Sequence, residues 1–143
     1  MSCNQSIYEL LSKIYKKVHS FDPFIIAKCY DYNIIYQNIG PYTLGTRIQS
    51  CRRTTIILDK NLQGAEKLLV PLHEIKHCIT DKGVGTPFLR KYSSFVPISK
   101  REATANSFAM NALINLYSYD LGNLTKYQIC DYFNLDYYWS NFI

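Results

Sequence analysis

The sequence predicts a single α+β domain that is mainly helical and contains a small, mostly antiparallel sheet of about three strands. Apolar residues recur at helical spacing near the N-terminus. Segments rich in β-branched residues and tyrosine follow between residues 33 and 58, and helical patterns return from about residue 61 onward. With 143 residues, 48% of them hydrophobic and 19% charged, the chain is long enough to bury a core.

The first half of the chain is expected to form two helices and then the sheet. Residues 4–19 are predicted to be an amphipathic helix, because apolar residues recur three and four positions apart. A second helix is expected to begin with Asp22 as N-cap and Pro23 in the first helical position. The predicted strands are 33–38, 42–48 and 54–58.

The next helix is expected to begin at Asn61 or Gly64 and to end at about Thr80. Pro71 interrupts its pattern, since a proline inside a helix removes a hydrogen bond and kinks the axis. Either this helix bends just before His73, or a fresh helix begins at Pro71.

Residues 83–98 contain two prolines, two glycines and two serines and are predicted to be a loop. A further helix is expected from Ser99 to about Tyr117. Two short helices, at about 125–133 and 136–142, complete the predicted fold.

One pentapeptide of the predicted central helix points to chemistry; it reads His73-Glu74-Ile75-Lys76-His77, or H-E-x-x-H. Positions four apart share a helix face, so the imidazoles of His73 and His77 can converge on one cation. Glu74 lies about 100° round the helix and can reach a metal-bound water without ligating the metal. Two neutral nitrogens, an open position and a carboxylate base are typical of a zinc hydrolase. The alternative is a surface helix with two solvated histidines.

A catalytic zinc usually takes three protein ligands, so a third must come from elsewhere. A histidine six residues after His77 would mark one class, but that position is Gly83. Two carboxylates are candidates, Glu102 and Asp81. Glu102 is favoured, because ligands from three consecutive turns would line up along the helix axis instead of surrounding the ion.

Glu102 also has a purely structural interpretation. Ser99 and Glu102 have the spacing of a capping box, in which the carboxylate would bond back to the Ser99 amide. One turn further on, Asn106 shares a face with Glu102 and can hold a ligating histidine through its other ring nitrogen.

Composition restricts the setting. The five cysteines are scattered and form no C-x-x-C, which favours a reducing cytoplasm over a disulfide framework or a thiolate zinc site. No signal peptide or membrane span is recognisable, so no membrane partner is expected. The net charge is +5, but the basic residues are spread out, and direct nucleic-acid binding is not expected.

These features together resemble the ImmA/IrrE family of metallopeptidases, which is common in bacteriophages and integrative elements. The similarity covers roughly residues 20–116. The matching segments are Asp22-Pro23-Phe24, Ile56-Ile57-Leu58, the H-E-x-x-H motif, and Glu102-Ala103-Thr104-Ala105-Asn106-Ser107-Phe108-Ala109, which looks like the family's E-x-x-A-N-x-F-A.

The resemblance implies a zincin-like fold and a zinc-dependent endopeptidase in the cytoplasm of a bacterial host. It implies zinc held by His73, His77 and Glu102, with Glu74 as general base and Asn106 behind a ligating histidine. The implied substrate is a helix-turn-helix repressor of a phage or mobile element, which is cleaved or inactivated. A non-catalytic anti-repressor that binds and blocks the repressor is the alternative.

Residues 1–20 are then an N-terminal helix, and residues 121–143 are a short helical tail resembling a reduced helix-turn-helix. The second tail helix contains no Arg or Lys, so packing against the body is expected, not DNA reading. Lys76 and Pro71 depart from the usual family pattern. Lys76 either faces solvent, or points inward and competes with zinc or lowers the basicity of Glu74.

Overall fold

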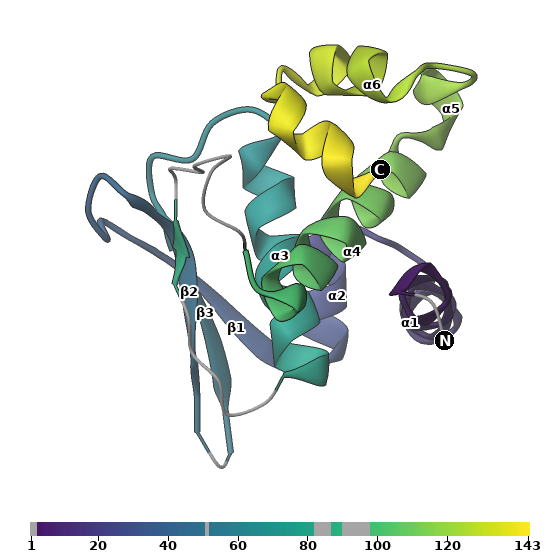
Figure 1. Cartoon of the computed structure of the whole chain (residues 1–143). Helices are drawn as coiled ribbons and strands as arrows, with labels where there is room; N and C mark the ends of the chain where they lie inside the picture. The colour runs from purple at the N-terminus through teal and green to yellow at the C-terminus, as the bar shows by residue number, and fades with distance from the viewer. Residues whose placement is uncertain (1–2, 51, 82–86, 90–97) are drawn as a thin grey trace.

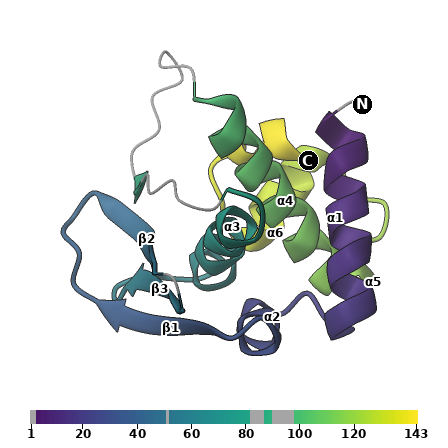
Figure 2. The ribbon, with the colours of Figure 1, turned by 90° about the horizontal axis from the view of Figure 1, so that it is seen from below.

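Helix α3 (Glu66–Thr80) lies at the centre of the computed structural model, which describes residues 3–50, 52–81, 87–89 and 98–143. Figure 1 and Figure 2 show a sheet on one side of α3 and helix α4 (Lys100–Leu116) on the other. The remaining elements are α1 (Cys3–Val18), α2 (Pro23–Cys29), β1 (Tyr32–Gln37), β2 (Thr43–Gln49), β3 (Thr54–Asp59), β4 (Phe88–Leu89), α5 (Ser118–Leu121), α6 (Lys126–Phe133) and the 3-10 helix η1 (Tyr137–Phe142).

The strand order in the sheet is β1-β3-β2-β4. β2 pairs antiparallel with β3 and with β4, whereas β1 pairs parallel with β3. The predicted α+β class and the mostly antiparallel sheet are therefore confirmed. Strand β4 corrects the prediction of a loop over 83–98, of which the structure describes 87–89 and 98. Two residues are too few to show an alternating pattern, so the sequence carries no signal for this strand.

The first two helices follow the sequence pattern closely. Ile7, Leu11 and Ile14 of α1 are buried against the core, as their helical spacing requires. The Asp22 carboxylate accepts a hydrogen bond of 2.9 Å from the Phe24 amide and caps α2, whose first residue is Pro23. Both cap predictions are confirmed, because capping depends on residues that are neighbours in the chain.

Helix α3 differs from prediction at its start and at Pro71. It begins at Glu66, after Gly64, because Gly64 has a φ of +58° that no right-handed helix accommodates. Pro71 lies inside one continuous helix, so the prediction of a fresh helix at Pro71 is wrong. Every residue from Leu69 to Cys78 is buried. A surface helix with solvated histidines is therefore excluded, since other elements cover α3 on all sides.

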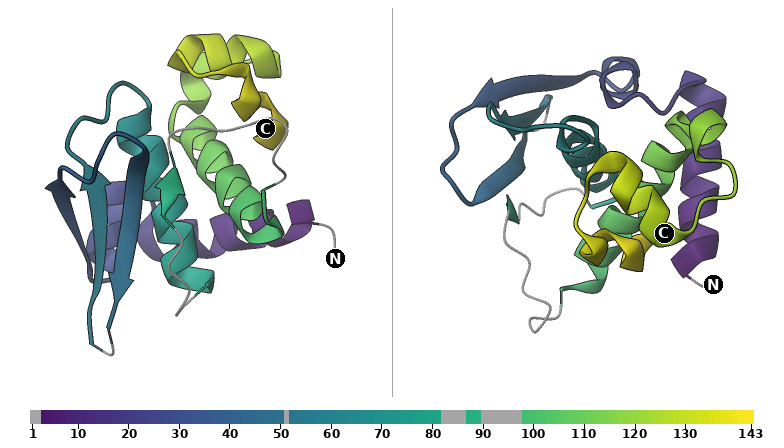
Figure 3. Two further views of the ribbon diagram at one scale, coloured as in Figure 1. Left: turned by 60° about the vertical axis from the view of Figure 1, so that its left-hand side comes forward. Right: turned by 90° about the horizontal axis from the view of Figure 1, so that it is seen from above.

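The tail packs against the body. Trp139 and Phe142 of η1 are 5% and 8% exposed and belong to the same hydrophobic core as α1, α3 and α4. Figure 3 shows α6 beyond the end of α4 and η1 turning back along the side of α4. The expectation that this segment packs against the body is confirmed, and full burial of such an aromatic side chain contributes about 1.5–3 kcal/mol. In the described residues, no helix is long and apolar enough to cross a membrane.

Candidate metal centre

Three side chains converge between α3 and the first turn of α4. The Nε2 atoms of His73 and His77 lie 3.2 Å apart. Glu102 places Oε2 at 2.9 Å from Nε2 of His73 and Oε1 at 3.2 Å from Nε2 of His77. One potential ligand atom from each residue lies within 4.8 Å of the other two, so the group can hold a metal ion.

The start of α4 brings Glu102 to this position. Ser99 is the N-cap, and its hydroxyl accepts a hydrogen bond of 3.2 Å from the Glu102 amide. The Glu102 carboxylate faces the two histidines, so only the serine half of the predicted capping box is present. Small buried side chains keep this helix thin where it packs against α3; they are Ala105, Ala109 and Ala112.

Each histidine forms a second hydrogen bond through its other ring nitrogen, Nδ1. Nδ1 of His73 lies 2.8 Å from Oδ1 of Asn106, which is the predicted partner on α4. Nδ1 of His77 lies 2.9 Å from Oδ2 of Asp81. Asp81 was an alternative third ligand, and that alternative is wrong. Its carboxylate lies one turn beyond His77 and reaches the ring nitrogen that faces away from Glu102, so it orients the histidine instead.

The chemistry of this donor set fits a cation. Asp81 and the Asn106 carbonyl oxygen accept hydrogen bonds, so the Nδ1–H groups donate and the Nε2 lone pairs point toward one another and toward Glu102. Three converging acceptors repel unless a cation or a proton lies between them. A tetrahedral zinc with ligand bonds of about 2.0–2.1 Å separates its donor atoms by roughly 3.4 Å, which is close to the spacing of His73, His77 and Glu102.

The charges around the site favour an ionised Glu102. Burial alone would raise the pKa of the Glu102 carboxyl. When a proton instead of a cation lies between these groups, hydrogen bonds and charge interactions with His73 and His77 outweigh burial and hold the Glu102 pKa well below the ordinary range. Glu102 is therefore an anionic ligand at neutral pH.

Lys76 lies neither in solvent nor in the metal site. It is 7% exposed, and its Nζ lies 3.3 Å from Oδ2 of Asp81, the oxygen that also binds His77. Arg101 approaches the other oxygen, with Nε at 3.6 Å from Oδ1. Lys76 thus supports the carboxylate that orients His77, and its Nζ is directed at Asp81.

Glu74 has a partner that sequence reasoning missed. Its Oε2 accepts a hydrogen bond of 3.0 Å from Nη1 of Arg47 on β2, and the two side chains are 0% and 1% exposed. One signal was available in the sequence. Side chains alternate along a strand, so Arg47 and Ile48 face opposite sides of β2 and only one of them can face the core. The structure buries Arg47 and leaves Ile48 59% exposed.

Phe88 of β4 covers one side of the histidine pair. Its ring stacks on His73 with 3.9 Å between centroids and 27° between planes, and it is 3% exposed. Strand β4 reaches this place by pairing with Thr43 and Gly45 of β2. The candidate metal centre therefore has an aromatic ring from the edge strand β4 stacked on one of its histidines.

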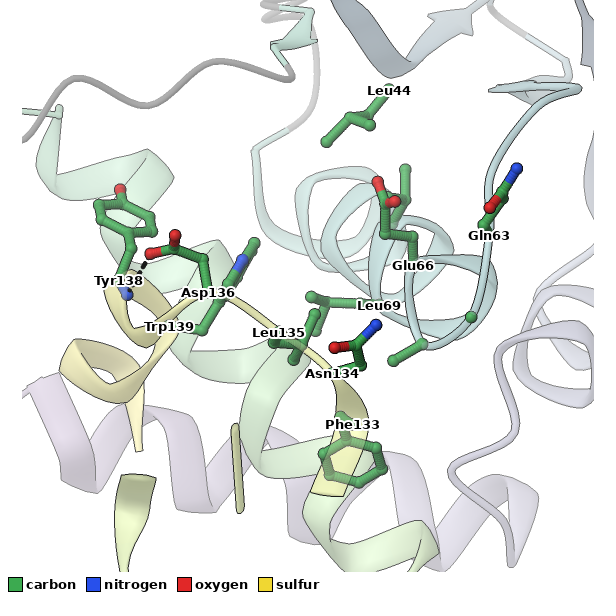
Figure 4. Close-up of a pocket in the computed structure, with 13 residues that line it drawn as sticks. Leu44, Gln63, Glu66, Leu69, Phe133, Asn134, Leu135, Asp136, Tyr138 and Trp139 are labelled. Carbon is green, nitrogen blue, oxygen red and sulfur yellow. Dashed lines mark hydrogen bonds between the residues drawn. The ribbon is translucent and has the colours of Figure 1, made fainter. Parts of the chain in front are cut away.

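A cavity of about 730 Å³ lies between β2, the start of α3 and the C-terminal tail. Figure 4 shows Leu44 of β2, Leu69 of α3 and Trp139 of the tail among its lining residues. Leu69 lies one turn before His73, and Trp139 meets Phe88 edge to face at 6.1 Å. Both apolar and polar side chains line the cavity, and its connection to the candidate metal centre runs from Trp139 through Phe88 to His73.

Comparison with known proteins supplies one context. No protein-family model matches the chain. No solved structure matches it significantly. The chain is 28% identical, over 115 residues, to a protein of Bacillus phage phi105 named "uncharacterized immunity region protein 2". The aligned part covers 78% of this chain and 72% of the phage protein. The chain is thus distantly similar, over most of its length, to a phage protein named for an immunity region.

Proposed function

We propose that this protein is a zinc-dependent endopeptidase of the ImmA/IrrE type that cleaves or inactivates a helix-turn-helix repressor of a phage or mobile element. One observation carries the proposal. The buried Nε2 atoms of His73 and His77 converge with the Glu102 carboxylate, and each histidine is held by an acceptor on its other ring nitrogen. This arrangement is typical of a catalytic zinc site with three protein ligands and an open position.

Four residues of the site would serve as metal ligands and general base. His73, His77 and Glu102 would hold the ion. Zinc bound there would supply a Lewis acid that lowers the pKa of a water and polarises the scissile carbonyl. Glu74 takes a proton from the attacking water and returns it to the leaving amine. Its Oε1 has no hydrogen-bond partner among the described residues and is the oxygen left for this role.

The substrate class is supported by context and by the shape of the site. Immunity regions of phages control repression, and the similarity to the phi105 protein supports a repressor as target. An extended segment of that repressor would lie beside β2, in the manner of an added strand, next to the helix that carries the H-E-x-x-H motif. Because β4 pairs with β2 at Thr43 and Gly45, such a segment would displace β4 or continue past it.

The ion pair between Glu74 and Arg47 favours a second candidate function, a non-catalytic anti-repressor. A carboxylate that is 0% exposed and bound to an arginine is less accessible than a general base usually is. In this case the protein would bind the repressor and block it without cutting. Either function would place the protein in the cytoplasm of a bacterial host, and neither requires contact with DNA.

Two measurements test the proposal. Elemental analysis of protein purified without chelator should find near-stoichiometric zinc, and Glu102→Ala should lose most of it. Intact-mass analysis of a helix-turn-helix repressor encoded near this gene should then find rapid cleavage by the wild type and only slow residual cleavage by Glu74→Gln. A wild type that takes up no zinc even when zinc is supplied would refute the peptidase. Repressor inactivation that survives Glu74→Gln without cleavage would establish the blocking function.

A further inference from the structure

Strand β2 runs along α3 in register. A Cβ atom on Gly45 would lie 2.8 Å from Cγ1 of Val70, so strand and helix are in close contact at that point. Two residues further along β2, Arg47 reaches Glu74. After two more, Gln49 donates a hydrogen bond of 3.4 Å to the carbonyl oxygen of Cys78.

The three contacts pair strand positions two apart with helix positions four apart. Two strand residues rise about 6.8 Å and four helix residues rise about 6.0 Å, so the two repeats stay matched over this length. The inward face of β2 therefore follows the glutamate side of the H-E-x-x-H helix. Arg47 is the one charged residue on that face of β2.

The contact between Arg47 and Glu74 is specific. The two charged groups are 1% and 0% exposed, with 3.0 Å between Nη1 and Oε2. Buried charges are tolerated only when they are paired and hydrogen-bonded, so neither side chain is free to swing away. The guanidinium engages one oxygen of Glu74, and the other oxygen, Oε1, is buried without a partner among the described side chains.

We propose that Arg47 is the positioning residue of the general base: it holds Glu74 by Oε2 and leaves Oε1 as the oxygen that takes the proton of water. This inference rests on the proposed peptidase function. A planar guanidinium holds a carboxylate in a fixed direction, which an ammonium group does not. Positioning of this kind acts on the rate of the chemical step, not on zinc affinity, because Glu74 is not one of the three ligands.

The main variant is Arg47→Met, with Arg53→Met as control. Arg53 is exposed, lies in the turn between β2 and β3 and carries the same charge. Arg47→Met should retain zinc by elemental analysis and lose roughly 100-fold in kcat for repressor cleavage, with KM within about threefold. Arg47→Lys should lie between Arg47→Met and the wild type. Arg53→Met should match the wild type in zinc content, kcat and KM.

A double-mutant cycle separates positioning from a structural role. In the Glu74→Gln background, Arg47→Met should cause little further loss of kcat, because the base is already gone. The urea midpoint of the metal-free double variant should exceed that of Arg47→Met, since removal of both partners leaves no unpaired buried charge. An equal loss of kcat in both backgrounds would show that Arg47 only fixes the register of β2.

Wild-type kcat in folded, zinc-loaded Arg47→Met or Arg47→Lys would overturn the positioning role while leaving the peptidase intact. If Arg47→Met does not fold, Arg47→Lys decides by the same criterion, with at least a tenfold loss of kcat expected. A zinc-loaded wild type that does not cleave the repressor would instead refute the proposed function. The two failures are therefore distinguishable.

Discussion

Replacement of Asn106 by alanine tests whether the metal centre depends on its outer hydrogen bonds. Asn106 lies on α4 and accepts a hydrogen bond of 2.8 Å from Nδ1 of His73. His73 is 1% exposed, so water does not readily replace the lost acceptor. The substitution leaves all three proposed ligands in place and removes only the group that holds one of them in orientation.

The expected size of the effect follows from this geometry. Loss of a hydrogen-bond partner behind a ligating histidine typically weakens metal affinity by about 10- to 100-fold, or about 1.4–2.8 kcal/mol. The buried Nδ1–H left without an acceptor should also lower the free energy of unfolding by about 1–3 kcal/mol. Glu102→Ala should weaken zinc binding further than Asn106→Ala, because it removes a ligand.

Competition with a chromogenic chelator at pH 7.5 would measure the zinc Kd of each variant, and urea denaturation would measure stability. Asn111→Ala is the matched control. It changes the same residue type on the same helix, but the Asn111 side chain donates to the Ser107 carbonyl at 2.8 Å and to the Phe142 carbonyl at 3.5 Å, and to none of the candidate ligands. It should leave zinc affinity unchanged. A folded Asn106→Ala with the zinc Kd of the wild type would refute the orienting role of Asn106 and weaken the assignment of His73 as a ligand.

Three further predictions concern stability and pH. Gly45→Ala should lower the free energy of unfolding by about 1–3 kcal/mol in urea, because its Cβ would lie 2.8 Å from Cγ1 of Val70; an unchanged midpoint would show that the two elements separate freely. The pKa of Glu102 is lowered in the fold, so its contribution to stability is complete above the ordinary carboxyl pKa and is lost as pH falls toward the folded value. Acid titration of the metal-free protein should therefore show less loss of stability for Glu102→Gln than for the wild type, and equal losses would contradict this. Burial, followed by the charge of Glu74, raises the pKa of the Cys78 thiol to about 12, so peptide mapping after iodoacetamide treatment at pH 8 should find exposed Cys29 alkylated and Cys78 unmodified.

Much of the fold was predictable because it depends on residues that are neighbours in the chain. Apolar spacing predicts α1, and side-chain caps predict the starts of α2 and α4 at Asp22 and Ser99. The parallel pairing of β1 with β3 was not predictable. Three short strands in sequence are compatible with several orders, and the order is decided by packing on the helices: β2 and β3 contact α3, whereas β1 contacts α2.

The metal-ligand set was predictable to the extent that helix geometry is local. His73 and His77 share a face through their spacing of four, and Glu102 was the carboxylate that a second helix could bring to them. The sequence did not determine whether the Glu102 side chain would cap its own helix or turn toward the histidines. The packing of α4 against α3 decided this, because both carboxylate oxygens face the Nε2 atoms.

By itself, then, the sequence determined the α+β class, the helix that carries the H-E-x-x-H motif and the candidate residues of a metal site. Only the tertiary structure decided that Asp81 orients His77, that Lys76 supports Asp81 and that Arg47 holds Glu74. The physical reason is the distance along the chain over which each interaction acts. Helix periodicity and capping act over about four residues, whereas Arg47 and Glu74 are 27 positions apart and meet because β2 packs along α3.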